Sequence, residues 1–361
     1  MNRATVTVRD IARRANVSNG TVSRVLNNHV NVADDLRSRV MAAANELGYA
    51  PVRRGQRTPP LPRVRCIGFL LTLPHLESAQ DLMAPFWAHL LQGAESEAAR
   101  LGAQVIYSSL PGRHVVPADV LQRIGDLGLD ATLLVGAPSP AVVTAVESLG
   151  MPVVVLDSVL DTDGPAGAHD AVLPDYFTGT YVVTQELLAA GHRRLAFIGG
   201  PLADGTVRNV VPAVEMRARG FREALVHAGV APTPDLLAAS DLTQQGGHDA
   251  ARALLAEQPD LTGLVCANDA LASGAMRALR GLGRRVPEDV SVVGGSDELG
   301  EHVFPPLTSS RFDPPALGAL AVQRLARRSE RPTAPAVTTI LPVEIVRRHS
   351  VVPPPAGPLP S

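Results

Sequence analysis

Apolar residues recur every three to four positions in three short segments near the start of the chain. The first two segments are residues 8–15 and 19–26, and a third with the same period covers residues 34–47. This spacing is typical of amphipathic helices. The pattern therefore predicts three short helices around a small core whose first members are Val8, Ile11, Ala12, Ala15, Val22, Val25 and Leu26.

Polar residues mark where these helices begin. Thr7 can cap the first helix, and Ser18 can cap the second after a turn at Asn16-Val17. Thr7 and Ser18 are also candidate DNA contacts. The outer face of the second helix carries short hydrogen-bonding groups and one guanidinium, at Asn19, Gly20, Thr21, Ser23, Arg24 and Asn27. Such groups suit base edges and phosphates. The segment is predicted to be a helix-turn-helix that binds DNA.

From residue 66 the pattern changes to apolar runs that alternate with amphipathic ones. Strands are expected at 66–72, 103–108, 131–135, 152–157, 194–198, 263–267 and 291–293. Helices are expected between most of them, for example at 85–101, 178–190, 213–228 and 270–281. Strand–helix alternation with apolar strands indicates parallel sheets covered on both faces. The length of this region suits two lobes with a cleft between them.

The resulting fold class is a small all-α helix-turn-helix headpiece followed by an α/β core of two doubly wound parallel-sheet lobes. The boundaries predicted are 1–50 for the headpiece, 51–65 for a Pro- and Arg-rich linker, 66–346 for the core and 347–361 for a Pro-rich tail. The tail is expected to be disordered because its prolines prevent helix formation.

The balance of charged residues also changes near residue 65. The first 65 residues hold 12 Arg against 4 acidic residues, whereas the rest is acidic overall. A basic head on an acidic body is typical of polyanion binding. The first residues lack the apolar run of a secretory signal, and no apolar run is long enough to span a membrane, so a cytoplasmic protein is expected. The two cysteines, Cys66 and Cys266, lie in apolar runs and are expected to be buried thiols.

Several motifs together resemble the lactose repressor/galactose repressor (LacI–GalR) family of bacterial transcriptional regulators. The first is VRDIARRANVSNGTVSRVLN, followed by NELGYAP. In the family's order there follow CIGFLL, PFWAHLLQGAESEAARLG, GHRRLAFIGG, MRARGFREAL, ANDALASGAMRAL and VPEDVSVVG with PPLTS. The resemblance covers about residues 5–346. It implies a periplasmic-binding-protein-like core, a homodimer on a pseudo-palindromic double-stranded DNA operator, and a small-molecule effector, commonly a sugar.

The resemblance places the family's base-reading positions on Asn19, Gly20 and Arg24. Arg24 can bind guanine and Asn19 adenine in bidentate fashion, whereas Gly20 has no side chain to offer. Thr21, Ser23 and Asn27 fit phosphate contacts, although a helix cap or a solvated face explains each equally well. The linker departs from the family because Gly55 and two prolines disfavour a helix. Its arginines are expected to bind phosphates or a narrow minor groove without strong bending, or to lie on an inert linker: Arg53, Arg54 and Arg57.

Candidate effector-binding residues lie where predicted strands meet predicted helices, the usual ligand edge of α/β sheets. The resemblance assigns a stacking role to Phe86 and Trp87 and a ligand contact to Arg217. The other candidates are Asn268, Asp269 and Asp297, with Asp157 and Asp175 as secondary ones. Each has an ordinary alternative, since Asp269 can be a helix cap, Trp87 a core residue and Arg217 a surface residue.

Motifs for phosphate loops, dinucleotide binding, serine hydrolases and zinc sites are absent from the sequence. No catalytic residue, metal ligand or cofactor is therefore predicted. The prediction is a transcriptional regulator, more commonly a repressor, whose DNA affinity a small polar effector controls. Two alternatives remain. One is a transport protein that binds sugars, and the other is a DNA-binding regulator with a vestigial pocket, constitutive or controlled by a protein partner.

Overall fold

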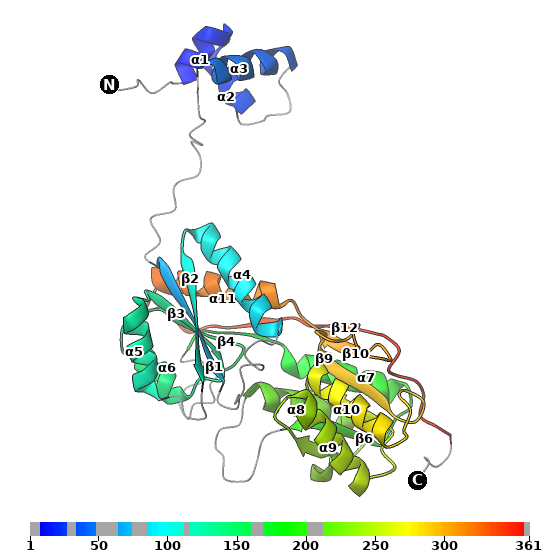
Figure 1. The fold of residues 1–361 in the computed structure, drawn as a ribbon. Coiled ribbons are helices and arrows are strands. Elements are labelled where there is room, and N and C mark those ends of the chain that lie inside the picture. Colours follow the sequence, from blue (N-terminus) through cyan, green and yellow to red (C-terminus); the bar gives the residue numbers. More distant parts are fainter. Residues whose placement is uncertain are drawn as a thin grey trace. The chain divides into compact units, whose positions relative to one another are not determined.

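The computed structural model of the chain forms two compact units, residues 1–61 and 62–361. The first holds the three predicted helices and the second holds the α/β elements (Figure 1). The residues that the structure describes are 8–26, 34–47, 64–73, 85–111, 116–159, 169–200 and 212–356.

The first unit packs α1 (Val8–Ala15), α2 (Asn19–Leu26) and α3 (Asp34–Glu46) around a small apolar core. The core residues are Ile11, Ala12, Ala15, Val22, Val25, Val40, Ala43 and Ala44, with Val17 and Leu47 packed against them. Asn16 turns the chain with a φ of 52°, in the left-handed region that Asn tolerates. Arg39 donates from Nη2 to the carbonyl of Ala15 (2.8 Å) and so closes the end of α1. The predicted three-helix unit is confirmed.

The first lobe of the second unit is built on a six-stranded parallel sheet in the order β11-β5-β4-β3-β1-β2. Its strands are β1 (Cys66–Leu73), β2 (Gln104–Pro111), β3 (Ala131–Gly136), β4 (Val153–Leu156), β5 (Ala171–Pro174) and β11 (Thr338–Leu341). Its helices are α4 (Pro85–Leu101), α5 (Pro117–Leu127), α6 (Pro140–Glu147) and α11 (Pro314–Glu330).

Both faces of this sheet are covered. Phe69 and Leu71 of β1 pack in the cluster that α4 and α11 complete, whereas Leu70 packs in the cluster of α5 and α6. Alternate residues of one strand thus enter opposite cores, as a doubly wound sheet requires. Figure 1 shows the two helix pairs on opposite sides of the strands.

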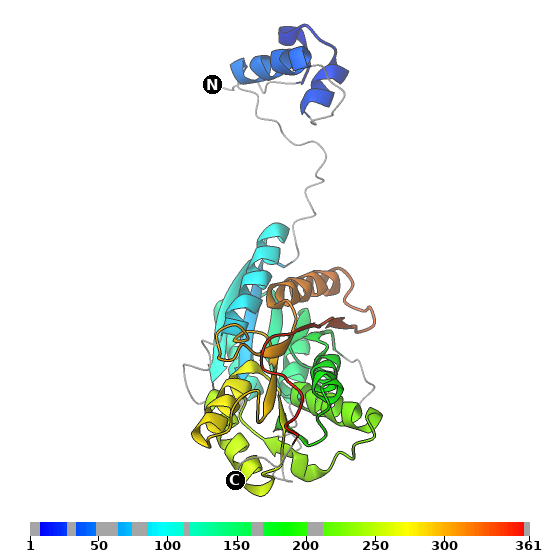
Figure 2. The same ribbon diagram turned by 90° about the vertical axis from the view of Figure 1, so that its right-hand side faces the viewer.

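The second lobe has its own six-stranded sheet in the order β12-β10-β9-β8-β6-β7. Its strands are β6 (Leu195–Gly200), β7 (Leu237–Ala239), β8 (Gly263–Cys266), β9 (Ser291–Ser296), β10 (Thr308–Arg311) and β12 (Glu344–Val346). All pair in parallel except β12, which runs antiparallel to β10. Its helices are α7 (Tyr176–Ala189), α8 (Pro212–His227), α9 (Gln244–Glu257) and α10 (Asp269–Gly281), and Figure 2 shows the yellow and the green helices on opposite sides of the orange strands.

The chain crosses between the lobes after β5, after β10 and after β11. The first two crossings bring Tyr176 and Phe312 to the junction of the lobes, beside the carboxyl ends of the first sheet's strands. This edge is where parallel α/β sheets bind ligands. The predicted fold class of a helical headpiece and two doubly wound lobes is confirmed.

The Pro-rich tail differs from the prediction. Ser350 is fully buried, and its hydroxyl donates to the carbonyl of Val292 (2.6 Å). His192 donates to the carbonyl of Val352 (2.8 Å), whose own N–H donates to the hydroxyl of Ser291 (3.1 Å). The expectation of disorder is therefore wrong for residues 347–356, because an extended chain can satisfy its backbone groups against neighbouring polar side chains.

Two smaller points complete the fold. Cys66 and Cys266 are buried free thiols, as predicted. Among the described residues, no helix combines the length and the apolar character that crossing a membrane demands.

Candidate functional site

The second headpiece helix, α2, begins with a side-chain cap. The hydroxyl of Ser18 accepts from the N–H of Thr21 (3.1 Å), as the sequence predicts for an N-cap. Val22 and Val25 face inward and are buried, whereas Ser18, Asn19, Gly20 and Arg24 are exposed and Thr21 is half-buried. The helix thus directs its apolar side to α1 and α3 and its polar side to solvent.

Arg24 lies close to the start of its own helix. A Cβ built on Gly20 would be 3.8 Å from Nη2 of Arg24 and 3.7 Å from the hydroxyl of Ser18. The guanidinium therefore lies alongside the preceding turn, in the direction that helical side chains take. One guanidinium and the first helical turn form a single polar surface.

Some of the DNA-binding candidates cannot be placed. Of Ser23, only its backbone position on α2 is described. The remaining candidates lie outside the described residues and stay predictions: Thr7, Asn27, Arg53, Arg54 and Arg57.

In the core, aromatic rings gather at the junction of the two lobes. The ring centroids of Phe86 and Trp87 are 4.6 Å apart, and those of Phe86 and Phe312 are 5.9 Å apart. Phe312 in turn meets Tyr176 edge to face at 6.2 Å. Phe86 and Trp87 start α4 and are only partly buried, so each keeps exposed ring surface beside the junction. Ring surface of this kind packs well against apolar carbons of a ligand.

Charged groups complete this cluster. The guanidinium carbon of Arg217 on α8 lies 3.7 Å from the ring centroid of Tyr176, a cation–π contact. The hydroxyl of Tyr176 donates to the carboxylate of Asp157, which follows β4. Arg217, Tyr176 and Asp157 thus form one chain of contacts from the second lobe to the first.

Asp157 is held in an unfavourable state. Its φ is 73°, and burial raises the pKa of its carboxyl to about 6, while the bond from Tyr176 and the charge of Arg217 lower it. Strain and desolvation together at a strand's carboxyl end are typical of binding sites. We call Phe86, Trp87, Asp157, Tyr176, Arg217 and Phe312 the junction cluster.

Asn268 and Asp269 instead organise the second lobe. Asn268 caps α10, since its Oδ1 accepts from the N–H of Leu271 (2.8 Å), and its amide donates to the carbonyl of Leu242 (3.0 Å). Asp269 is almost fully buried and accepts from the hydroxyl of Ser309 (2.6 Å) and from the N–H of Leu299 (3.0 Å). The helix cap that was the alternative role for Asp269 is therefore made by Asn268. Asp269 instead anchors the loop after β9.

Asp175 and Asp297 also have partners within the protein. Asp175 caps α7 by accepting from the N–H of Thr178 (3.0 Å). Asp297 forms an ion pair with Arg348 (2.5 Å) and lies 3.6 Å from Arg311, with only 3% of its side chain exposed. These carboxylates therefore serve the protein's own structure in the state described.

The structure adds residues that the sequence did not indicate. Tyr176 and Phe312 follow β5 and β10, two short strands that the apolar pattern did not predict. Glu298 lies just after β9 and is mostly buried, and burial together with the charges of Asp269 and Asp157 raises its pKa to about 7. The available signal for Tyr176 and Phe312 was an aromatic residue soon after the first crossing and directly after the second.

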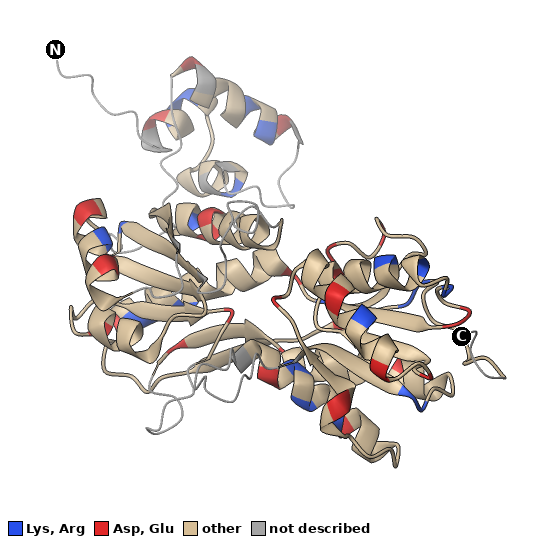
Figure 3. Cartoon of the chain, turned by 60° about the horizontal axis from the view of Figure 1, so that its bottom comes forward, with Lys and Arg blue, Asp and Glu red and all other residues tan. Residues whose placement is uncertain are grey.

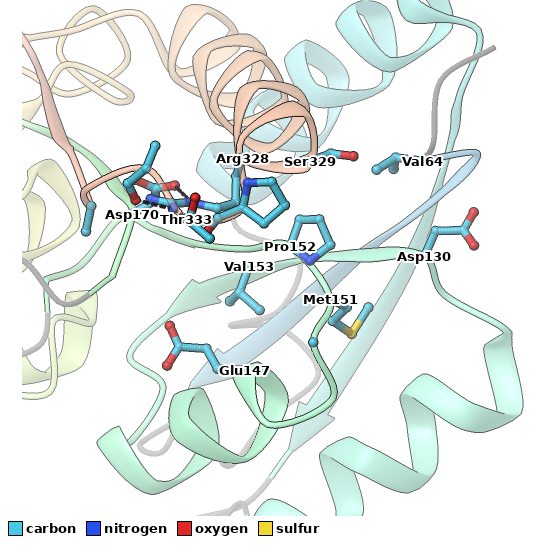
Figure 4. A pocket seen from close by; sticks show the side chains of 14 residues that line it. Val64, Asp130, Glu147, Met151, Pro152, Val153, Asp170, Arg328, Ser329 and Thr333 are labelled. Atoms are coloured by element: carbon cyan, nitrogen blue, oxygen red, sulfur yellow. Dashed lines mark hydrogen bonds and ion pairs between the residues drawn. The ribbon is translucent and has the colours of Figure 1, made fainter. Parts of the chain in front are cut away.

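Two cavities lie away from this cluster. One of about 590 Å³ is lined by residues before β1, β3, β4 and β5, including Asp130 and Asp170 (Figure 4). It is therefore at the amino ends of the strands, opposite the junction cluster. In it Arg328 binds Asp170 (2.6 Å) and the carbonyl of Ala334 (2.6 Å). A second, of about 490 Å³, lies beside Arg194 and Asp260.

Among the described residues, no three His, Cys, Asp or Glu side chains come together as metal ligands would. Acidic and basic residues alternate along the helices of the two lobes (Figure 3). The Arg excess instead belongs to the first 65 residues.

Comparison with known proteins identifies two matching families. The lacI family of bacterial regulatory proteins matches residues 7–52, and a periplasmic binding protein-like domain matches residues 184–351. The ribose operon repressor of Haemophilus influenzae is 30% identical over 96% of this chain and 98% of its own. The transcriptional regulator CelR of Thermobifida fusca is 32% identical over 95% and 98%.

Solved structures agree with the sequence comparison. The CelR–cellobiose complex superposes with a TM-score of 0.70 at 30% identity and covers 96% of this chain and 100% of its own. The lac repressor dimer bound to operator and the anti-inducer ONPF gives 0.67 at 28%, with 97% and 100% covered. Likeness over nearly the whole length, in headpiece and core alike, shows that the chain belongs to the LacI family of DNA-binding transcriptional regulators and is not an enzyme.

Proposed function

We propose that the protein is a cytoplasmic homodimeric repressor that binds a pseudo-palindromic operator and responds to a sugar. The exposed polar start of α2 would enter the major groove, and two headpieces would occupy successive half-sites. The relative solved on its operator is a dimer, and other relatives were solved with cellobiose or ribose bound.

The junction cluster is the main support for the proposal that the effector is a sugar. Sugar sites combine an aromatic face with hydrogen-bonding charged groups. Phe86 and Trp87 offer the face, while Arg217 and Asp157 offer a donor and an acceptor. These groups come from both lobes, so a ligand between them would favour one relative position of the lobes over another.

Operator binding is tested by selecting duplexes from a random pool and measuring affinity for the selected sequence. Arg24→Ala should lose about 1–3 kcal/mol of discrimination at one base position, because a bidentate guanine contact disappears. Arg252→Ala, an exposed change on α9 of the same charge, is the control and should leave selected binding intact. Equal losses in both variants would reduce the role of Arg24 to net charge.

Effector binding is followed by the fluorescence of Trp87, the only tryptophan, during titration with mono- and oligosaccharides. Arg217→Ala should weaken the binding that the wild type shows, whereas Arg219→Ala, an exposed change on the same helix, should not. Asp269 is unsuitable for this test because it anchors the loop after β9. A wild type that responds to none of the sugars would favour a regulator with a vestigial pocket.

The linker arginines at 53, 54 and 57 remain part of the proposal. We expect them to bind phosphates or the minor groove without a strong bend, since Gly55 and the prolines after Thr58 disfavour a helix. Gel mobility of the complex on circularly permuted operator fragments measures the bend. A strong central kink would contradict this expectation.

A further inference from the structure

Glu298 has an unusual position at the junction of the lobes. Its Oε1 is buried and, among the described residues, has no hydrogen-bond partner. Its neighbour Asp297 is instead paired with Arg348 and Arg311. Two consecutive carboxylates after β9 therefore differ, since Asp297 is paired within the protein whereas Oε1 of Glu298 has no donor among the described residues. An unsatisfied buried carboxylate oxygen is costly, so its presence calls for an explanation.

The backbone holds Glu298 in this position from both sides. Before it, Ser296 and Asp297 have φ values of 111° and 55°, in a region that side-chain-bearing residues rarely adopt. The N–H of Asp297 also donates to the hydroxyl of Ser309 (3.2 Å). After it, the N–H of Leu299 donates to Asp269 (3.0 Å). Two hydrogen bonds thus fix the loop, one on each neighbour of Glu298 in the chain.

The groups that act on Glu298 are acidic. They are Asp269 at the start of α10 and Asp157 from the first lobe. The nearby cations are engaged, since Arg348 is paired with Asp297 and Arg217 lies over the ring of Tyr176 beside Asp157. Among the described residues, Glu298, Asp269 and Asp157 therefore have no free cation beside them, and their negative charge lies at the junction.

We propose that Glu298 and Asp157 together accept a protonated amine, so that the effector is an amino sugar rather than a neutral one. An aliphatic ammonium carries three donors and no acceptor, and its charge offsets the excess at the junction. A hydroxyl would satisfy the hydrogen bond but leave the charge uncompensated. This inference rests on the proposed function, because it names the class of sugar that the junction cluster selects.

The first test compares D-glucosamine and D-galactosamine with D-glucose and D-galactose, by the thermal shift of the full-length protein at pH 7. The amino sugar should raise the melting temperature more than its neutral parent, and Glu298→Gln should abolish that difference. A neutral parent that stabilises the wild type equally or better would overturn the inference but leave the proposed sugar effector standing. No shift with any of the four sugars would overturn the inference and count against the sugar effector as well.

Two further comparisons in the same thermal-shift experiment test the role of Glu298 and the specificity for an amine. A preference for the amino sugar that survives in Glu298→Gln would overturn the role of Glu298. Magnesium chloride alone is the second arm, and a shift as large as that of the amino sugar would mean that the two carboxylates take any cation. Glu301→Gln, on the same loop and 76% exposed, is the matched control and should keep the wild-type preference.

The second test needs no ligand. Glu298 has a folded-state pKa of about 7 against a usual value of 4.5, so the folded protein holds its proton more tightly than the unfolded chain. Wild-type stability should therefore fall, relative to Glu298→Gln, as pH rises from about 4.5 to 7. We expect the variant to melt higher than the wild type at pH 8 and equally near pH 4.5. A variant no more stable than the wild type at pH 8 would show that Glu298 already has a partner.

Discussion

Neighbouring residues near the end of the chain make very different contributions. Arg348 is 10% exposed and pairs with the 3% exposed Asp297, whereas Arg347 is 64% exposed and pairs with Glu186 on α7. Removing one partner of a buried pair leaves an uncompensated charge. The exposed pair contributes little because water screens it. The segment predicted to be disordered therefore holds an anchor of the loop after β9.

We predict that Arg348→Met lowers the free energy of unfolding by about 3 kcal/mol. Arg311, 3.6 Å from Asp297, keeps the loss from being larger. The matched variant Arg347→Met should lose less than about 1 kcal/mol. Urea unfolding measures both. Losses of similar size would mean that the Arg348–Asp297 pair adds no more than an exposed one.

The sequence predicted some residues of the junction cluster but could not separate ligand contacts from helix caps. Phe86, Trp87, Asp157 and Arg217 were predicted and do come together at the junction. Asn268 was predicted as a ligand contact, but both ends of its amide are bound within the second lobe. A strand-end Asp or Asn has the same pattern whether it caps a helix or faces a ligand, so the choice depends on contacts distant in sequence.

At the scale of elements, helices α4 and α11 lie unusually close together. A Cβ on Gly318 would clash with the carbonyl oxygen of Leu90, and one on Gly93 with that of Pro315. Glycine is required here for space and not for its backbone freedom. This contact packs α11 against the first lobe, although its sequence follows the second lobe's β10.

We predict that Gly318→Ala destabilises the first lobe by about 1–3 kcal/mol, because the helices must separate. Gly125→Ala on α5 is the control, since nothing lies within 4 Å of the added Cβ. It should be neutral or stabilising by up to about 1 kcal/mol through helix propensity. Unfolding followed by the fluorescence of Trp87 on α4 reports on this lobe. Stabilisation by Gly318→Ala would refute the close contact.

The sequence predicts long elements well and short polar strands poorly. The bounds predicted for α4 agree with those observed, because its apolar period and its Pro start are both strong signals. β10, Thr308–Arg311, has no apolar residue, yet its first three residues are buried. Ser309 is stabilised there by its bond to Asp269, a contact that no local pattern predicts.

At the scale of the whole molecule, the proposed repressor joins a DNA-binding headpiece to a core in which we place the effector site between the two lobes. The junction cluster draws its residues from both lobes, so a ligand that contacts all of them has different affinities for different lobe positions. In the proposed function, a link between those positions and the headpieces would make DNA affinity depend on the effector. Such coupling is typically about 5- to 150-fold.

The most direct test is a titration of the full-length protein with its selected operator in the absence and presence of a saturating sugar. We predict that the sugar changes operator affinity by about 5- to 150-fold, and that operator DNA changes the affinity for the sugar by the same factor. Trp87 fluorescence measures the second quantity. A sugar that binds saturably yet leaves operator affinity unchanged would contradict the claim that this protein is an effector-controlled regulator.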